Sequence, residues 1–289
     1  MHIRICGGLL ATMLFIVAAG CASKVTPTPG LPGAPVAIGD AMQAYHRADS
    51  RDALLQAIRM LERYAQDNPD DYSSRARLAN AYTLLGLGYT DDIGKKEAAY
   101  SAAVRYAEEA MLTEPGFAHV WKERGVSFSL ALQQLDHRHI EALSYYRSAQ
   151  FLDYQECKGA MGRLLDISQM QRAVAVMDRL AQIDPNISDG TNLAMQGLYK
   201  IRQPDYLGGD DVTAQYLLER AAQDNPRNII PRWVRAKYFA IDAGKRDLFV
   251  RDLRWVAEQP LEQLVGHRPW NIVIQRDAKA LLSQASRLF

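Results

Sequence analysis

The chain has 289 residues and carries 34 Lys and Arg against 33 Asp and Glu, which leaves a formal net charge of +1. A charge so close to zero argues against nucleic-acid binding and against attraction to anionic lipid. With 48% hydrophobic residues, a chain of this length can bury a large core in one or two domains.

Residues 1–20, MHIRICGGLLATMLFIVAAG, have the pattern of a secretory signal peptide, with Arg4 near the start and an apolar run over 9–19. The apolar run is shorter than the roughly 20 residues that cross a membrane. The ending VAAGC resembles the lipobox of bacterial lipoproteins, which implies cleavage before Cys21 and attachment of lipid to it. Ala22 follows, and by the same resemblance a residue other than Asp there favours the outer membrane. The alternative is an ordinary signal peptide with a chance cysteine.

Lipidation would leave the mature protein with a single thiol. Cys6 would leave with the leader, so Cys157 would have no partner for an internal disulfide. We expect this thiol to be inert, because no histidine or other base is adjacent to it in the sequence. An exported protein without disulfides must be held together by its core.

The rest of the chain divides by composition into a tether and one helical domain. Residues 21–38 are rich in proline, glycine and small residues, which favours an extended segment between lipid and globule. Residues 39–289 show long Ala, Leu, Arg and Glu runs with apolar residues at three and four spacing, which predicts helices.

Self-similar phrases recur along the helical domain. Four segments end in RYAQDNP, EAMLTEP, RLAQIDP and RAAQDNP, and in each an alanine stands twelve residues before the closing proline. A small residue allows two helices to approach closely, and proline ends a helix because it has no N–H. The alanines are Ala57, Ala103, Ala173 and Ala214, and a fifth copy without proline carries Ala142 and Ala149.

A second signature precedes these helices. Residues 82–89, YTLLGLGY, and 121–128, WKERGVSF, match the W-x2-L-G-x2-Y phrase of tetratricopeptide repeats, and Gly162 and Gly197 mark weaker copies. We therefore expect an all-α fold, an α-solenoid of tetratricopeptide-like helix pairs, in which each glycine lets the partner helix approach.

The C-terminal region predicts a divergent last pair and a cap. Phe249, Leu253 and Val256 would share one helical face in DLFVRDLRWVAEQP. The run after Pro269 predicts a capping helix with Arg and Lys on its outer side.

Three helix pairs are longer than the usual unit of about 34 residues, and the extra residues fall between glycine and alanine. These insertions are YTDDIGKKEAAY, QQLDHRHIEA and RQPDYLGGDDVTA, and we expect long loops there. Within the first, TDDIGKK is typical of a turn followed by a helix start. Insertions of this kind tend to emerge on one face, which is commonly the binding face.

The third insertion predicts a loop that joins two helices. Its residues are Pro204, Gly208, Gly209 and Asp210. The proline would end one helix, and the glycines permit backbone angles that other residues resist. Asp210 or Asp211 would then cap the next helix.

No converging set of catalytic groups is visible. His137 and His139 in DHRHIE lie near acids and could suggest a metal site or an enzyme, but residues two apart on a helix point in different directions. A solvated, charged loop is the interpretation we prefer. Nothing resembles a nucleophile elbow, a zinc-protease helix or a phosphate loop. We expect no enzyme activity, no metal and no cofactor.

Aromatic side chains are the better candidates for ligand binding. The candidates are Tyr82, Tyr89, Trp121, Phe128, Tyr145 and Tyr146. Most of them occupy repeat positions that pack a solenoid, so a core role is the first alternative. A minority would line a cavity between repeats.

The chain resembles the lipoprotein T component of tripartite ATP-independent periplasmic (TRAP) transporters over most of its length after the leader. The resemblance rests on the lipobox, RLANAYTLLGLGY, AAVRYAEEAML, AQFLD, the Pro-x-x-x-Gly-Gly-Asp of 204–210, and AKYFAIDAGKRDLFVRDLRWVAEQP followed by NIVIQRDAKALL. It implies a lipid-anchored periplasmic helical protein that partners a periplasmic substrate-binding protein. It also implies a homotrimer with a central pore or cavity as one form of assembly.

Two functions from different classes follow. The leading hypothesis is a non-catalytic lipoprotein, on the periplasmic face of the outer membrane, that binds or passes a hydrophobic small molecule, a lipid or an organic acid. Proteins similar to this family act in sterol and lipid traffic, which fits that hypothesis. The alternative is a protein–protein scaffold whose concave face grips a peptide of an outer-membrane machine.

Overall fold

The computed structural model describes residues 35–159, 162, 167–184, 190–202 and 209–289, and no strand occurs among them. The predicted all-α class is therefore confirmed. Within those ranges, no helix combines the length and the apolarity needed to cross a membrane. The predictions for Cys21, Pro204 and Gly208 fall outside the described residues.

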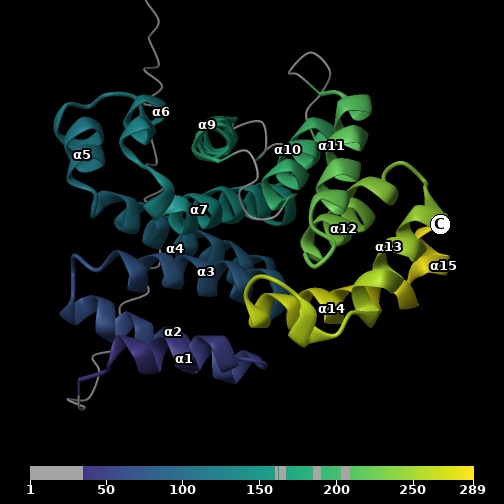
Figure 1. Cartoon of the computed structure of the whole chain (residues 1–289), viewed down its shortest axis with the longest axis horizontal. Helices are drawn as coiled ribbons and strands as arrows, with labels where there is room; N and C mark the ends of the chain where they lie inside the picture. The colour runs from purple at the N-terminus through teal and green to yellow at the C-terminus, as the bar shows by residue number, and fades with distance from the viewer. Residues whose placement is uncertain (1–34, 160–161, 163–166, 185–189, 203–208) are drawn as a thin grey trace, which may run out of the picture. The chain divides into compact units, whose positions relative to one another are not determined.

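The helical domain consists of helices joined mainly by short loops (Figure 1). In chain order they are α1 (Ile38–Arg47), α2 (Arg51–Asp67), α3 (Tyr72–Gly88), α4 (Ile93–Leu112), α5 (Pro115–Ala118), α6 (Phe128–Ala131), α7 (Ile140–Leu152), α9 (Ile167–Ile183), α10 (Thr191–Arg202), α11 (Asp211–Asp224), α12 (Ile230–Val234), α13 (Arg246–Glu258), α14 (Arg268–Ser283) and α15 (Ala285–Leu288). Turns of 3-10 helix cover Leu132–Gln134, His137–His139 and Leu261–Gln263, and π-helical turns cover His119–Glu123, Asp153–Cys157 and Arg235–Ala240.

The first four helices pack in sequence order, each against the next. The starts of α2, α3 and α4 are set by side chains that accept a hydrogen bond from the backbone N–H three residues on, which satisfies one of the free N–H groups of a first turn. These N-caps are Ser50, Asp71 and Asp92. Asp210 has the same role at the start of α11, where its carboxylate accepts from the Thr213 N–H at 2.9 Å.

The repeated alanines lie where helices meet. Five of them are fully buried and the sixth, Ala173, is 1% exposed. The fully buried ones are Ala57, Ala103, Ala142, Ala149 and Ala214. A side chain of one carbon at these buried positions leaves room for a neighbouring helix. Phe249, Leu253 and Val256 are also fully buried, which confirms the predicted apolar face of α13.

Two of the four signature glycines permit a close approach. A Cβ at Gly86 would lie 2.6 Å from Cε1 of Tyr100 on α4, and one at Gly197 would lie 2.9 Å from Cγ of Leu218 on α11. The prediction is wrong for Gly125, which has a φ of +60° and follows the π-helical turn His119–Glu123. Its left-handed backbone ends the helix, and an added Cβ would meet no described atom within 4 Å, so none of the described helices packs against it. At Gly162, the described atoms nearest to an added Cβ belong to the Lys158 side chain, and the first lies at ordinary contact distance, 3.5 Å.

The first predicted long loop is also wrong. Only residues 89–92 separate α3 from α4, because Asp92 caps a helix that begins at Ile93 and takes up most of YTDDIGKKEAAY. The turn and helix start predicted in TDDIGKK are therefore confirmed. The inserted residues lengthen α4 rather than forming a loop.

The final long helix contacts both ends of the helical domain. The predicted helix after Pro269 is present as α14, with Arg276 and Lys279 exposed. A cap at the end of a solenoid contacts only the preceding repeat. α14 instead packs against α1 and α3 as well as against α12 and α13 (Figure 1). A Cβ on Gly88 of α3 would overlap Cγ1 of Val273, which shows how closely α3 and α14 approach.

Candidate ligand-binding cavity

A cavity of about 230 Å³ lies among α7, α10, α12, α14 and the end of α3. Most of its wall is apolar. The apolar lining residues are Leu87, Phe151, Leu152, Met195, Leu198, Ile230, Trp233, Val234, Val265 and Trp270. The rest of the lining consists of polar residues, two tyrosines and a glycine: Ser144, Tyr145, Arg147, Ser148, Thr191, Asn228, Tyr238, Gly266, His267 and Asn271.

Helical periodicity brings these side chains to one wall. On α7, Ser144, Arg147 and Phe151 follow one another at spacings of three and four, so they share a face. On α10, Thr191, Met195 and Leu198 do the same. Leu87 on α3 also lines the cavity, whereas the lining residues from α10 onward are more than a hundred positions further along the chain. The cavity therefore forms only when the chain folds.

The wall tryptophans present their apolar rings and satisfy their N–H groups elsewhere. Trp270 Nε1 donates to Oδ1 of Asn80 at 2.6 Å, and Trp233 Nε1 donates to Oδ2 of Asp277 at 2.6 Å. Tyr145 packs against Trp270 with ring centroids 5.9 Å apart. A buried Trp needs a partner for its N–H, and here that partner is supplied without using the ring faces.

Arg147 is the charged side chain of the described lining, and it is 1% exposed. Its Nη1 donates to Oδ1 of Asn192 at 2.6 Å, and its Nη2 lies 3.4 Å from the Ser148 hydroxyl. Among the described residues, its Nε has no hydrogen-bond partner and no carboxylate lies within 4.0 Å of it. Burial lowers the pKa of Arg147 to about 10, so the guanidinium is charged at neutral pH.

Two further groups define the polarity of the wall. The Ser144 hydroxyl is buried and has no partner among the described residues. His267 is held neutral at pH 7, because burial, then Arg77 and His46, lower its pKa to about 3. Nη1 of Arg77 lies 3.0 Å from Nδ1 of His267 and 3.2 Å from Oε1 of Glu141, so that arginine already has a carboxylate partner.

Of the six aromatic candidates, Tyr145 lines the cavity. Trp121, Phe128 and Tyr146 come together elsewhere in an aromatic cluster with Phe117. Ring centroids are 5.2 Å apart for Trp121 and Phe128, and 5.4 Å apart for Phe128 and Tyr146. This cluster belongs to the core around α4, α6 and α7.

Tyr82 and Tyr89 lie apart from both groups. Tyr82 stacks on Tyr106 at 5.6 Å and donates its hydroxyl proton to Glu62 at 2.7 Å. Arg276 lies over the Tyr89 ring at 4.8 Å from its centroid. A ligand-binding role for either remains a prediction.

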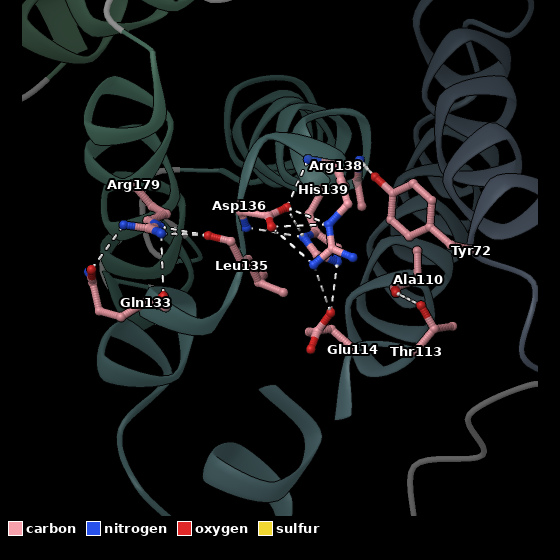
Figure 2. A network of polar contacts seen from close by, with 11 residues as sticks. Tyr72, Ala110, Thr113, Glu114, Gln133, Leu135, Asp136, Arg138, His139 and Arg179 are labelled. Atoms are coloured by element: carbon pink, nitrogen blue, oxygen red, sulfur yellow. Dashed lines mark hydrogen bonds and ion pairs between the residues drawn. The ribbon is translucent and has the colours of Figure 1, made fainter. Parts of the chain in front are cut away.

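The DHRHIE segment is a helix start with an internal hydrogen-bond network (Figure 2). The Asp136 carboxylate accepts from the backbone N–H of Arg138 at 2.9 Å, and the Asp136 N–H donates to Nδ1 of His139 at 3.1 Å. His139 is buried while His137 is exposed. In the described part of the chain, no group of three or more His, Cys, Asp or Glu is arranged to hold a metal ion.

Cys157 is half-buried at the end of the π-helical turn after α7. Burial, reinforced by the Asp153 carboxylate, raises the pKa of its thiol to about 12. The thiol is therefore protonated at neutral pH, and a protonated thiol is a poor nucleophile. This supports the interpretation of Cys157 as inert.

Sequence reasoning missed Arg147, the most unusual group in the wall. One signal was present in EALSYYRSAQFLD, residues 141–153, because Arg147 lies four residues from both Leu143 and Phe151, which are buried. A charged residue on the buried stripe of an amphipathic helix marks either an ion pair or a site.

A family model described as TRAP transporter T-component matches residues 50–289. The chain belongs to this family. The match starts at the N-cap of α2 and includes every residue that lines the cavity. The T-component is an accessory component of TRAP transport, and membership associates this chain with that transporter system. No curated protein matched the sequence.

Proposed function

We propose that this T-component is a non-catalytic lipoprotein that binds or passes a ligand in the cavity beside α7, together with a periplasmic substrate-binding protein. The ligand classes are a hydrophobic small molecule, a lipid or an organic acid. The mainly apolar cavity of about 230 Å³, with a few polar groups in one wall, carries this proposal. Binding sites for small molecules commonly combine apolar walls with a few placed polar groups.

The size of the cavity supports a ligand rather than a packing defect. An apolar cavity of about 150 Å³ accommodates benzene in other proteins. Core packing normally leaves few voids larger than a water molecule, because each lost contact costs dispersion energy. Two tryptophans line this cavity, and their N–H groups already have partners. Leaving about 230 Å³ empty would therefore cost dispersion energy, which favours a bound ligand.

The remaining parts of the proposal concern placement and assembly. Lipid on Cys21 and a tether over 21–38 would hold the helical domain at the periplasmic face of the outer membrane. Close approaches at Gly86 and Gly197 support tetratricopeptide-like helix pairs at those two places. Assembly as a homotrimer is part of the same proposal and is tested by mass measurement of the purified protein.

Extraction of ligand from the purified protein, followed by mass spectrometry, tests the proposal. Ser144→Phe would fill the cavity from α7 while removing a hydroxyl without a partner. We expect it to lose the co-purified molecule and keep its helical circular dichroism. Ser101→Phe, on the exposed face of α4, is the matched control and should retain it. A wild-type protein that carries no apolar molecule and binds no substrate-binding protein in pull-downs contradicts the proposal.

The second candidate is a scaffold for an outer-membrane machine. It is favoured by two apolar side chains one turn apart on α11, since Val212 is 82% exposed and Tyr216 is 57% exposed. A complex with integral outer-membrane proteins that survives Ser144→Phe but is lost in Val212→Ser/Tyr216→Ser would favour the scaffold. Loss of partner binding in Ser144→Phe alone would favour the ligand carrier.

A further inference from the structure

We propose that molecules enter and leave the cavity through an opening at Gly266, in the segment that joins α13 to α14. The inference rests on the proposed function and names the residue that limits how fast a bound molecule exchanges with the solvent. Gly266 would be the narrowest part of the route, and its lack of a side chain would keep the route open.

The exposure of the lining residues locates the opening. Within the described lining, Gly266 is exposed and every other residue is buried or half-buried. Phe151 on α7 and Met195 on α10 are buried, so the walls that they form are closed to solvent. A molecule that exchanges with the solvent must pass the lining where the lining reaches the surface. That place is Gly266.

A second hollow, of about 300 Å³, adjoins the cavity at the same residue. Gly266 and Asn271 line both spaces, so this short part of the chain lies between them. Three residues of the second hollow are exposed, namely Glu262, Gly266 and Arg268. The second hollow therefore faces the solvent and forms the outer part of the route.

The backbone at Gly266 leaves space for a side chain that the glycine does not have. Its φ is +87°, a conformation that favours glycine. A Cβ at this position would meet no described atom within 4 Å, so close packing does not require the glycine. Asn, Asp and His are the other residues found most often at positive φ. A side chain of one of these types would extend into the opening.

The residues on both sides of the glycine are held in place. The Val265 N–H donates to the Arg227 carbonyl at 3.1 Å, and the Val265 carbonyl accepts from Nδ2 of Asn271 at 3.1 Å. The His267 carbonyl accepts from the Trp270 N–H at 2.9 Å, in the first turn of α14. Because these contacts fix the edges of the opening, the side chain at the glycine position sets its width.

Exchange rates of a small apolar probe test the inference. Fluorine NMR exchange spectroscopy of the full chain in a non-ionic detergent, with 5-fluoroindole as the probe, gives the association and dissociation rates. Gly266→His places a bulky side chain in the opening, and at about pH 8 an exposed histidine with its ordinary pKa of about 6.5 is neutral.

Both rates should fall about tenfold or more in Gly266→His, which is the lower end of the one to three decades over which association rates vary among variants of one site. The dissociation constant should stay within about twofold, because the same barrier is crossed in both directions and the free and bound states are unchanged.

Gly244→His is the matched control. Gly244 also has a positive φ, +64°, is exposed, and would place a Cβ with no described atom within 4 Å. It precedes α13 and is not a lining residue of the cavity. The control therefore carries the same kind of backbone strain and should keep the wild-type rates. Gly266→Asn has a shorter side chain and should slow exchange less than Gly266→His.

Three results overturn the opening at Gly266: unchanged rates in Gly266→His, equal slowing in Gly244→His, or a weaker affinity at an unchanged association rate. Loss of probe binding in Ser144→Phe would then leave the proposed carrier function standing. A probe that Ser144→Phe still binds, or that wild type does not bind, overturns both. If Gly266→His does not fold, the comparison of Gly266→Asn with Gly244→Asn decides the matter.

Discussion

The indole nitrogen of Trp270 donates a hydrogen bond to Oδ1 of Asn80 at 2.6 Å, although the two residues are 190 positions apart in the chain. The same oxygen accepts from the Tyr45 hydroxyl at 2.7 Å. One buried amide therefore joins α1, α3 and α14. This contact holds the last long helix on the first ones and keeps Trp270 in the cavity wall.

Asn80→Ala should destabilise the protein by about 2–6 kcal/mol, because it leaves two buried donors without an acceptor, at about 1–3 kcal/mol each. Chemical denaturation followed by circular dichroism measures this. Asn225→Ala, which removes one exposed hydrogen bond to the Arg227 N–H, is the control and should cost under about 1 kcal/mol. Equal losses for the two variants would show that the shared acceptor has no special role.

Asp252→Asn should cost about 3–5 kcal/mol, because it leaves Arg235 buried without an anionic partner. Replacing the pair by Arg235→Met with Asp252→Leu should recover part of that loss, since the desolvation cost of both charges disappears. Asp247→Asn, on the exposed side of α13, is the control and should change the free energy of unfolding by less than about 0.5 kcal/mol. A double variant as unstable as Asp252→Asn would contradict this account.

Gly86→Ala should destabilise the packing of α3 on α4 by about 1–3 kcal/mol, because its Cβ would lie 2.6 Å from the Tyr100 ring. That ring cannot easily move, since it is fully buried and its hydroxyl donates to Glu156 at 3.0 Å. Gly39→Ala in α1 adds a Cβ with no described atom within 4 Å and should stabilise by up to about 1 kcal/mol. Thermal unfolding of both variants checks the opposite signs.

His267 should make stability fall in acid. Its folded pKa, about 3, lies below its unfolded value near 6.5, so the unfolded chain binds the extra proton between those pH values. The stability it contributes is complete above about pH 6.5 and is lost at about 1.4 kcal/mol per pH unit as the pH falls toward 3. His267→Gln should remove this contribution, so wild type should lose stability faster than the variant between about pH 6 and pH 4. Parallel pH profiles in urea titrations would refute it.

The local features of this protein were predictable from its sequence because they depend on neighbours in the chain. Periodicity identified the buried alanines and the apolar face of α13, and turn chemistry identified the helix start in TDDIGKK and the cap at Asp210. The errors arose where one pattern has two structural outcomes. The glycine of WKERGVSF matched a helix-crossing signature, yet Gly125 ends a helix with a positive φ.

The tertiary structure alone decided where α14 lies and which side chains face the cavity. A periodic pattern shows that one face of a helix is buried but does not identify the helix that covers it. Trp270 thus meets Asn80 across 190 residues. The sequence places Arg147 on an ordinary apolar stripe, and the structure shows that no carboxylate among the described residues lies near it. The sequence by itself determined an all-helical chain of the T-component family. Long-range packing decided the cavity, because its wall combines α3, α7, α10, α12 and α14, whose contacts no local pattern encodes.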